Sequence, residues 1–136
     1  MQEGTPVSLE ERRKIKELEE TVLPGRVEEI TEICGAPIPY EVDWSSFDGD
    51  LKGLTFLDNL SCHRLNMALR VICSDDLGKE AVRDTLKKIR LRNVADPEDK
   101  SLAFTKGALE MSYAYAAGLD GAFSDDEIRE LLLANL

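Results

Sequence analysis

The sequence has no long uninterrupted apolar run. An apolar stretch at residues 65–73 is broken by Asn66 and Arg70, whereas a membrane-spanning helix needs roughly 20 apolar residues. The first residues, Met1 to Gly4, also lack the basic flank and the apolar segment of a signal peptide. We therefore expect a cytoplasmic protein with no membrane partner.

Cysteine and histidine are scarce. The chain has three cysteines, Cys34, Cys62 and Cys73, none of them in a Cys-x-x-Cys pair, and a single histidine, His63. An odd number of widely spaced cysteines indicates neither a disulfide framework nor a zinc site. We expect buried free thiols, and we predict no cofactor.

Basic residues are too few to balance the acidic ones. The sequence has 17 Lys and Arg against 27 Asp and Glu, which gives a formal net charge of −10 and a pI near 4.6. A surface of this sign repels phosphate backbones and anionic lipid headgroups. The charge therefore disfavours nucleic acid as a partner and favours another protein of basic or polar character.

The charge is unevenly distributed. The formal charge sums to −8 over residues 1–60, to +2 over residues 61–100 and to −4 over residues 101–136. The positive centre is carried by six cations on a predicted helix and strand: Lys79, Arg83, Lys87, Lys88, Arg90 and Arg92. This stripe either docks an acidic partner or is neutralised within the chain. Internal pairing is favoured because the surplus of carboxylates is large.

Length and composition predict one globular domain over residues 1–136. The chain is 43% hydrophobic and 32% charged, which is ordinary for a folded domain of this size. A capping box at Ser8 and Glu11 predicts the start of a helix. Because Pro24-Gly25 is a strong helix breaker, we expect a helical hairpin over residues 8–34, followed by the core of the domain at residues 38–136.

The remaining segments predict strands and helices in a defined order. Alternating residues 40–44 predict a strand, and Thr55 is the expected N-cap of a helix over residues 56–73. A second helix is expected over residues 77–89, with Leu77 on its apolar side. Three strands then follow, at residues 89–94, 102–105 and 109–115, joined by short turns. A capping box at Ser124 and Glu127 opens a terminal helix.

This order predicts an α+β fold. The elements read ααβααβββα, and three consecutive strands with short turns predict an antiparallel β-meander. We expect the helices to pack on one side of that sheet.

The segment Asp120 to Glu127 resembles the second half of an EF-hand calcium loop. Asp120, Gly121, Phe123 and Glu127 match its acidic residue, glycine, apolar residue and closing glutamate. The two earlier ligand positions lack side-chain oxygens, and the preceding segment is predicted to be a strand. A turn followed by a capping box therefore explains these residues better, and we predict no metal site, with Asp120 and Glu127 as the candidate ligands if a metal binds.

Cys62 and His63 are adjacent, as a nucleophile and its base could be. Consecutive helical residues point about 100° apart, so their side chains diverge. We expect His63 on the apolar stripe of Leu60 and Met67, as a core or boundary residue. Cys73 follows Cys62 by about 16 Å along the same helix, which is too far for both to bind one metal ion.

An acidic loop follows the first predicted strand. It carries Asp43, Trp44, Phe47, Asp48 and Asp50. These carboxylates suit a hard cation, a basic protein or solvent. The interleaved aromatic residues favour contact with a protein over contact with a metal ion.

Three hypotheses of function remain. The leading one is a non-enzymatic protein that binds another protein, as small inhibitors, immunity proteins and secretion chaperones do, through the acidic loop and the positive stripe. The first alternative is a small enzyme with a site around Cys62, His63, Asp43 and Asp48. The second is a structural component that forms an oligomer, such as a homodimer, through its terminal helix or a strand edge.

Overall fold

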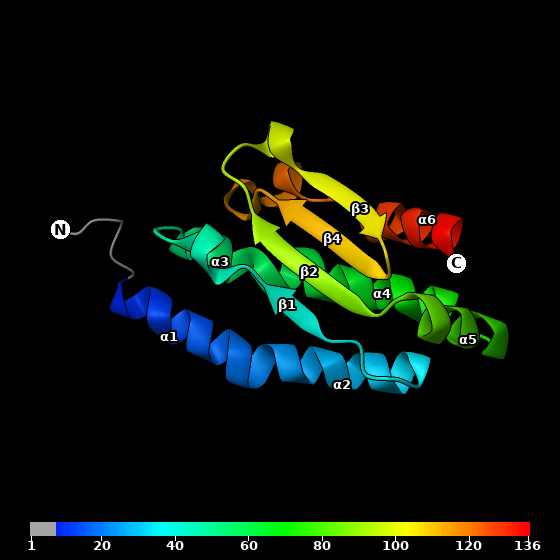
Figure 1. Cartoon of the computed structure of the whole chain (residues 1–136). Helices are drawn as coiled ribbons and strands as arrows, with labels where there is room; N and C mark the ends of the chain where they lie inside the picture. The colour runs from blue at the N-terminus through cyan, green and yellow to red at the C-terminus, as the bar shows by residue number, and fades with distance from the viewer. Residues whose placement is uncertain (1–7) are drawn as a thin grey trace.

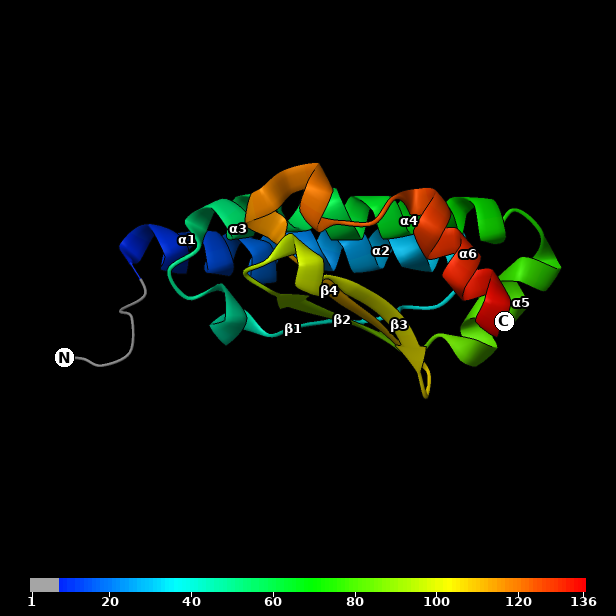
Figure 2. The same cartoon turned by 90° about the horizontal axis from the view of Figure 1, so that it is seen from above.

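A computed structural model describes residues 8–136 of the chain. A four-stranded sheet forms one layer, and the helices pack together on one of its faces. Figure 1 looks onto the other face, which no helix covers, and Figure 2 shows the two layers from above. The predicted α+β class and the one-sided helical layer are confirmed.

The first helical segment is one helix, so the predicted hairpin over residues 8–34 is wrong. It runs through α1 (Leu9–Glu17), a π turn (Leu18–Val22) and α2 (Leu23–Cys34). Proline normally breaks a helix because its ring clashes with the carbonyl four residues before it. Here the wider π turn ends at Val22, two residues before Pro24, and the Leu23 amide donates to the Leu18 carbonyl. The helix then continues past the proline.

Gly25 gives a direct test of this continuity. It lies in α2, and a methyl group built on it would meet no atom within 4 Å. Alanine has the higher helix propensity, so Gly25→Ala is expected to raise the free energy of unfolding by about 0.5 to 1 kcal/mol. Urea denaturation of the two proteins measures the difference. Destabilisation by alanine would contradict a continuous helix at this position.

The second long helix begins earlier than predicted and also contains a π turn. It comprises α3 (Leu51–Leu57), the π turn Asp58–Cys62 and α4 (His63–Ile72). Its N-cap is Asp50, which accepts a hydrogen bond from the Gly53 amide at 2.8 Å, and Thr55 lies inside the helix. The prediction of Thr55 as the cap missed this Asx turn, which serves equally well as a helix start.

The π turn also changes which residues of α4 are buried. An extra residue in the turn rotates the following helix by about 100°, so helical spacing cannot be carried across it. Leu65 and Leu69 are buried, whereas His63 and Met67 are exposed. The expectation that His63 is a core or boundary residue is therefore wrong.

Helix α5 (Asp76–Thr85) is shorter than predicted. Its N-cap is Asp75, and the chain is already extended at Leu86. Val82 and Leu86 are buried as expected. Leu77 is 77% exposed, because it lies in the first turn of the helix and points away from the domain, so its assignment to the apolar side is wrong.

The sheet is mixed, and the predicted antiparallel meander is wrong. The strands are β1 (Tyr40–Val42), β2 (Lys88–Asn93), β3 (Ser101–Thr105) and β4 (Ala108–Tyr113). Their spatial order is β1-β2-β4-β3, with β1–β2 and β2–β4 parallel and β3–β4 antiparallel. The strand β4 thus lies between β2 and β3.

Local chain geometry accounts for this order. Lys106 and Gly107 have positive φ values of 51° and 84°, as the two-residue hairpin turn between β3 and β4 requires. The longer connection from β2 contains the 3₁₀ helix Pro97–Asp99 and carries the chain past the position of β4 to the edge. The more apolar β4 takes the buried centre, and β3, with alternate residues exposed, takes the edge.

Two more short elements complete the fold. The 3₁₀ helix Trp44–Phe47 follows β1, and the 3₁₀ helix Tyr115–Gly121 follows β4, so Trp44 and Tyr115 lie outside the strands predicted for them. Helix α6 (Asp125–Asn135) begins with the predicted capping box, as does α1. Within residues 8–136, no helix combines the length and the apolar character that a membrane crossing requires.

Candidate interaction surface

The open face of the sheet carries a row of charged side chains across three strands. The register aligns Glu41 of β1 with Arg90 of β2, and Arg90 with Glu110 of β4. Arg90 forms ion pairs with both, at 3.4 Å from Nε to Glu41 Oε1 and at 3.2 Å from Nη1 to Glu110 Oε2. A hydrogen bond from Lys88 is the main cause that lowers the pKa of Glu41, and Arg90 adds to it. Arg90 is therefore neutralised within the chain.

A second row lies one step further along the strands. The Asp43 amide donates to the Leu91 carbonyl at 2.9 Å, which extends the β1–β2 pairing by one residue. Arg92 aligns with Ser112, and its Nε donates to Ser112 Oγ at 3.4 Å. In the part of the chain that the structure describes, no carboxylate forms an ion pair with Arg92. Arg92 thus remains available to an incoming carboxylate.

These rows line a groove of about 540 Å³ on the open face. Its charged and polar lining comes from all four strands and from the residue that follows β1. Asp43, Arg90 and Arg92 all contribute to it. Asp43 of the acidic loop and Arg90 and Arg92 of the positive stripe therefore line the same groove. The parallel pairing of β1 with β2 brings them together there.

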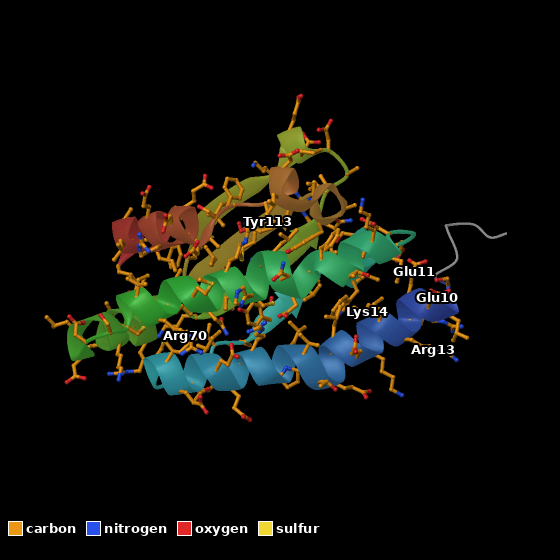
Figure 3. The ribbon with its side chains drawn as sticks, turned by 180° about the vertical axis from the view of Figure 1, so that it is seen from behind. Glu10, Glu11, Arg13, Lys14, Arg70 and Tyr113 are labelled. Carbon is orange, nitrogen blue, oxygen red and sulfur yellow. The ribbon has the colours of Figure 1, made fainter. Side chains whose placement is uncertain are left out.

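The loop at residues 43–50 is held against the carboxyl end of β2 by Asn93. The Asn93 amide donates to Ser46 Oγ at 2.9 Å, and its side-chain nitrogen donates to the Ser46 carbonyl and to Asp50 Oδ2. Glu11 holds the same loop from α1 by accepting from the Gly49 amide at 2.8 Å. Figure 3 shows Glu11 at the start of α1, beside the beginning of α3. Sequence reasoning missed both anchors.

The predicted contact residues of this loop divide into two groups. Asp43 and Asp48 are exposed, and Trp44 lines a second groove, of about 560 Å³, between α2 and β1. Phe47 is only 1% exposed and packs on Tyr115, with ring centroids 5.4 Å apart. Asp50 caps α3. Both residues therefore support the fold: the Phe47 ring is inside the core, and the half-buried Asp50 carboxylate is engaged by the Gly53 amide and the Asn93 side chain.

The positive stripe is also divided. Arg90 and Arg92 lie on the open sheet face, whereas Lys79, Arg83 and Lys87 belong to α5 or its end and do not line the groove. Arg83 Nη1 donates to the Cys34 carbonyl at 3.2 Å, and Lys87 Nζ donates to the Arg83 carbonyl at 2.7 Å. Arg83 and Lys87 therefore serve helix ends, which is a usual place for cations.

Cys62 and His63 lie in different environments. The Cys62 side chain is fully buried, and burial is the main cause that raises its pKa to about 12. His63 is exposed on the outer face of α4. A buried thiol with a raised pKa is a poor nucleophile at neutral pH, and these two side chains share no proton.

Asp120 and Glu127, the two candidate calcium ligands, also lie in different surroundings. Asp120 is exposed in the 3₁₀ helix Tyr115–Gly121, while Glu127 accepts from the Ser124 amide at 3.0 Å and from Ser124 Oγ at 3.2 Å. The Glu127 carboxylate is thus engaged in the capping box. Across residues 8–136, no three His, Cys, Asp or Glu side chains gather as metal ligands would.

A polar network between α2 and α4 was not predicted. Arg26 donates two hydrogen bonds to the Asp58 carboxylate, from Nε at 2.7 Å and from Nη2 at 2.8 Å. Its Nη1 donates to Glu29 Oε1 at 2.9 Å. The buried Asn66 donates to Glu29 at 2.8 Å and accepts from the Tyr40 hydroxyl at 3.1 Å. The hydrogen bond from Asn66 is the main cause that lowers the pKa of Glu29. This network fixes the π turn that begins at Asp58 to the helix α2 and to β1.

Fold and surface together define an α+β chain whose mixed sheet is covered by helices on one face and carries a charged groove on the other. Comparison with protein-family models, with curated proteins and with solved structures finds no match to this chain. The function is therefore argued from the residues of the chain itself.

Proposed function

We propose that this chain is a non-enzymatic protein that binds another protein, of basic character, through the open face of its sheet. The observation that supports this proposal is the one-sided fold. The long helices pack on one face of the sheet, and the other face presents a groove lined by Asp43, Arg90 and Arg92. An uncovered face with a shaped and charged centre is a suitable interface.

The charges indicate the chemistry of the partner. The net charge of −10 accelerates the approach of a positively charged protein and repels an acidic one. Asp43 and Asp48 offer exposed carboxylates at the carboxyl end of β1 to lysine or arginine side chains of the partner. Arg92 then takes a carboxylate or a carbonyl oxygen of the same partner, which fixes the orientation of the complex.

Burial weakens the alternative of a small enzyme. The best nucleophile named from the sequence, Cys62, is inside the core with a raised pKa, whereas His63 is exposed to solvent on α4. Asp43 and Asp48 lie at the sheet, next to β1. The residues of that hypothetical site are therefore not gathered at one place.

Charge reversal at the carboxyl end of β1 tests the proposal. The double variant Asp43→Lys, Asp48→Lys is expected to lower the association rate with the partner about tenfold at low salt, and the difference should shrink as salt rises. The partner is first captured from lysate of the source cells with the tagged wild-type chain. Binding of the purified captured protein is then measured by surface plasmon resonance over a salt series.

A matched control separates local from global charge. Glu28→Lys, Glu32→Lys changes the net charge by the same amount on the exposed side of α2. This control should retain most of the association rate. Equal losses in both double variants would show that only the total charge matters, and an unchanged rate in the Asp43, Asp48 variant would exclude this surface.

A further inference from the structure

Two cysteines far apart in the sequence meet inside the fold. Cys34 is the last residue of α2, and Cys73 directly follows α4. Their Sγ atoms are 2.9 Å apart, although the residues are separated by 39 positions. Helices α2 and α4 lie side by side, and their C-terminal ends reach the same end of the molecule, next to α5 (Figures 1 and 3). The free thiols are buried as expected, but their pairing was not predicted.

The surroundings of the pair favour a thiolate on Cys73. The hydrogen bond from Cys34 is the main cause that lowers the pKa of Cys73, and the cations Lys79 and Arg83 lower it further. The same hydrogen bond raises the pKa of Cys34, which keeps its proton. Arg83 is fixed near the pair because it donates to the Cys34 carbonyl. A thiolate beside a protonated thiol is the arrangement of many reactive cysteine pairs.

We propose that Cys34 and Cys73 form a redox-active dithiol that hydrogen peroxide converts to a disulfide. Each sulfur needs to move by less than about 1 Å to reach the S–S bond length of about 2.05 Å. The pair lies at the C-terminal ends of α2 and α4. Cys73 is 4% exposed and Cys34 is 0% exposed, so a small oxidant reaches Cys73 first.

The reaction has two steps that balance. The Cys73 thiolate attacks one oxygen of hydrogen peroxide and forms a sulfenic acid as hydroxide leaves. Cys34 sulfur then attacks Cys73 Sγ, the S–S bond forms, and the sulfenic oxygen departs as water after taking the Cys34 proton. The hydroxide becomes water by taking up the proton that Cys73 released when it ionised. The net change is two thiols and one peroxide converted to one disulfide and two waters.

Oxidation has a physical consequence for the fold. The disulfide closes a loop that contains β1, the segment 43–50 and both halves of the second long helix. Closing a loop of this length removes conformational freedom from the unfolded chain and is expected to raise Tm by about 10 °C. The inference does not depend on the proposed function.

Peptide mapping tests the pairing on the wild-type chain. Trypsin separates the three cysteines because Lys52, Arg64 and Arg70 lie between them. After peroxide treatment and alkylation under denaturing conditions, mass spectrometry should find the peptide 27–52 linked to the peptide 71–79. Cys62 should be alkylated as a free thiol, and dithiothreitol should release the linked peptides.

Variants provide the second readout. Cys34→Ser and Cys73→Ser should each abolish the rise of Tm that peroxide causes, whereas Cys62→Ala should retain it. Alkylated Cys34 and Cys73 in the wild-type chain after peroxide treatment would overturn the proposal, and so would sulfinic acid on Cys73 without a linked peptide. Because this result is obtained on the wild-type chain, the proposal stays testable if a variant fails to fold.

Discussion

Replacing Phe47 by alanine is expected to lower the free energy of unfolding by about 3 to 5 kcal/mol. The Phe47 ring is 1% exposed and contacts the rings of Tyr115 and Trp44, with centroids 5.4 and 6.3 Å away. Tyr115 is itself a fully buried core residue, and Trp44 lies in the same 3₁₀ helix as Phe47 and packs against the core. They cannot close the space that the ring leaves, so a cavity adds to the lost burial of apolar surface.

The adjacent exposed residue supplies the control. Urea denaturation followed by circular dichroism measures the loss, and Asp48→Ala should change the free energy of unfolding by no more than about 0.5 kcal/mol. If Phe47→Ala proves as mild as Asp48→Ala, the ring does not lie in the core. The measurement therefore decides whether Phe47 is a core residue, as in the structure, or an exposed contact residue, as predicted from the sequence.

Features that depend on neighbouring residues were predictable from the sequence. The capping boxes at Ser8 and Ser124 are both present, because each needs only a glutamate three residues further along. The short turn predicted between the last two strands is present at Lys106-Gly107, and it too depends only on local residues. The one-sided helical layer followed from the alternation of apolar and polar residues in the strands, which marks one face for burial.

Features set by distant contacts were not predictable in this way. Pro24-Gly25 has the composition of a helix end, and only the π turn before it shows why the helix continues. The three consecutive strands fit a meander equally well, since the order depends on whether β3 or β4 pairs with β2. The apolar content of β4 explains why β4, and not β3, pairs with β2. A strand between two others is more buried than an edge strand, and β4 is almost entirely buried.

The candidate sites show the same limit. Asp43 and Arg92 were assigned to two separate surfaces, and the β1–β2 register brings both to one groove. The pair Cys34 and Cys73 depends on the packing of α2 against α4, which no spacing in the sequence reveals. For Phe47, an aromatic residue in a polar loop has no local signal of burial, because the burial follows from the 3₁₀ turn that points the ring inward.

Gly121→Ala is expected to destabilise the protein by about 3 kcal/mol. A methyl group built on Gly121 would lie 1.9 Å from the Ala114 carbonyl oxygen and 2.7 Å from its carbon. Both are backbone atoms, so the chain itself must move to relieve the clash. The Ala114 amide also donates to the Gly121 carbonyl at 2.9 Å, and any separation of the two residues weakens that bond.

Thermal and urea denaturation measure the effect, with Gly25→Ala as the matched control, since no atom lies within 4 Å of the added methyl group there. Opposite signs for the two glycines are the expected result. A neutral Gly121→Ala would mean that the backbone at Ala114 is freely displaced.

Calcium binding is the competing explanation for this glycine, because an EF-hand loop also requires a glycine at this position. The wild-type chain should show the same Tm with and without calcium, since close approach to Ala114 is sufficient reason for Gly121 and Glu127 already caps α6. A rise of Tm with calcium would instead assign Asp120 and Glu127 to a metal site.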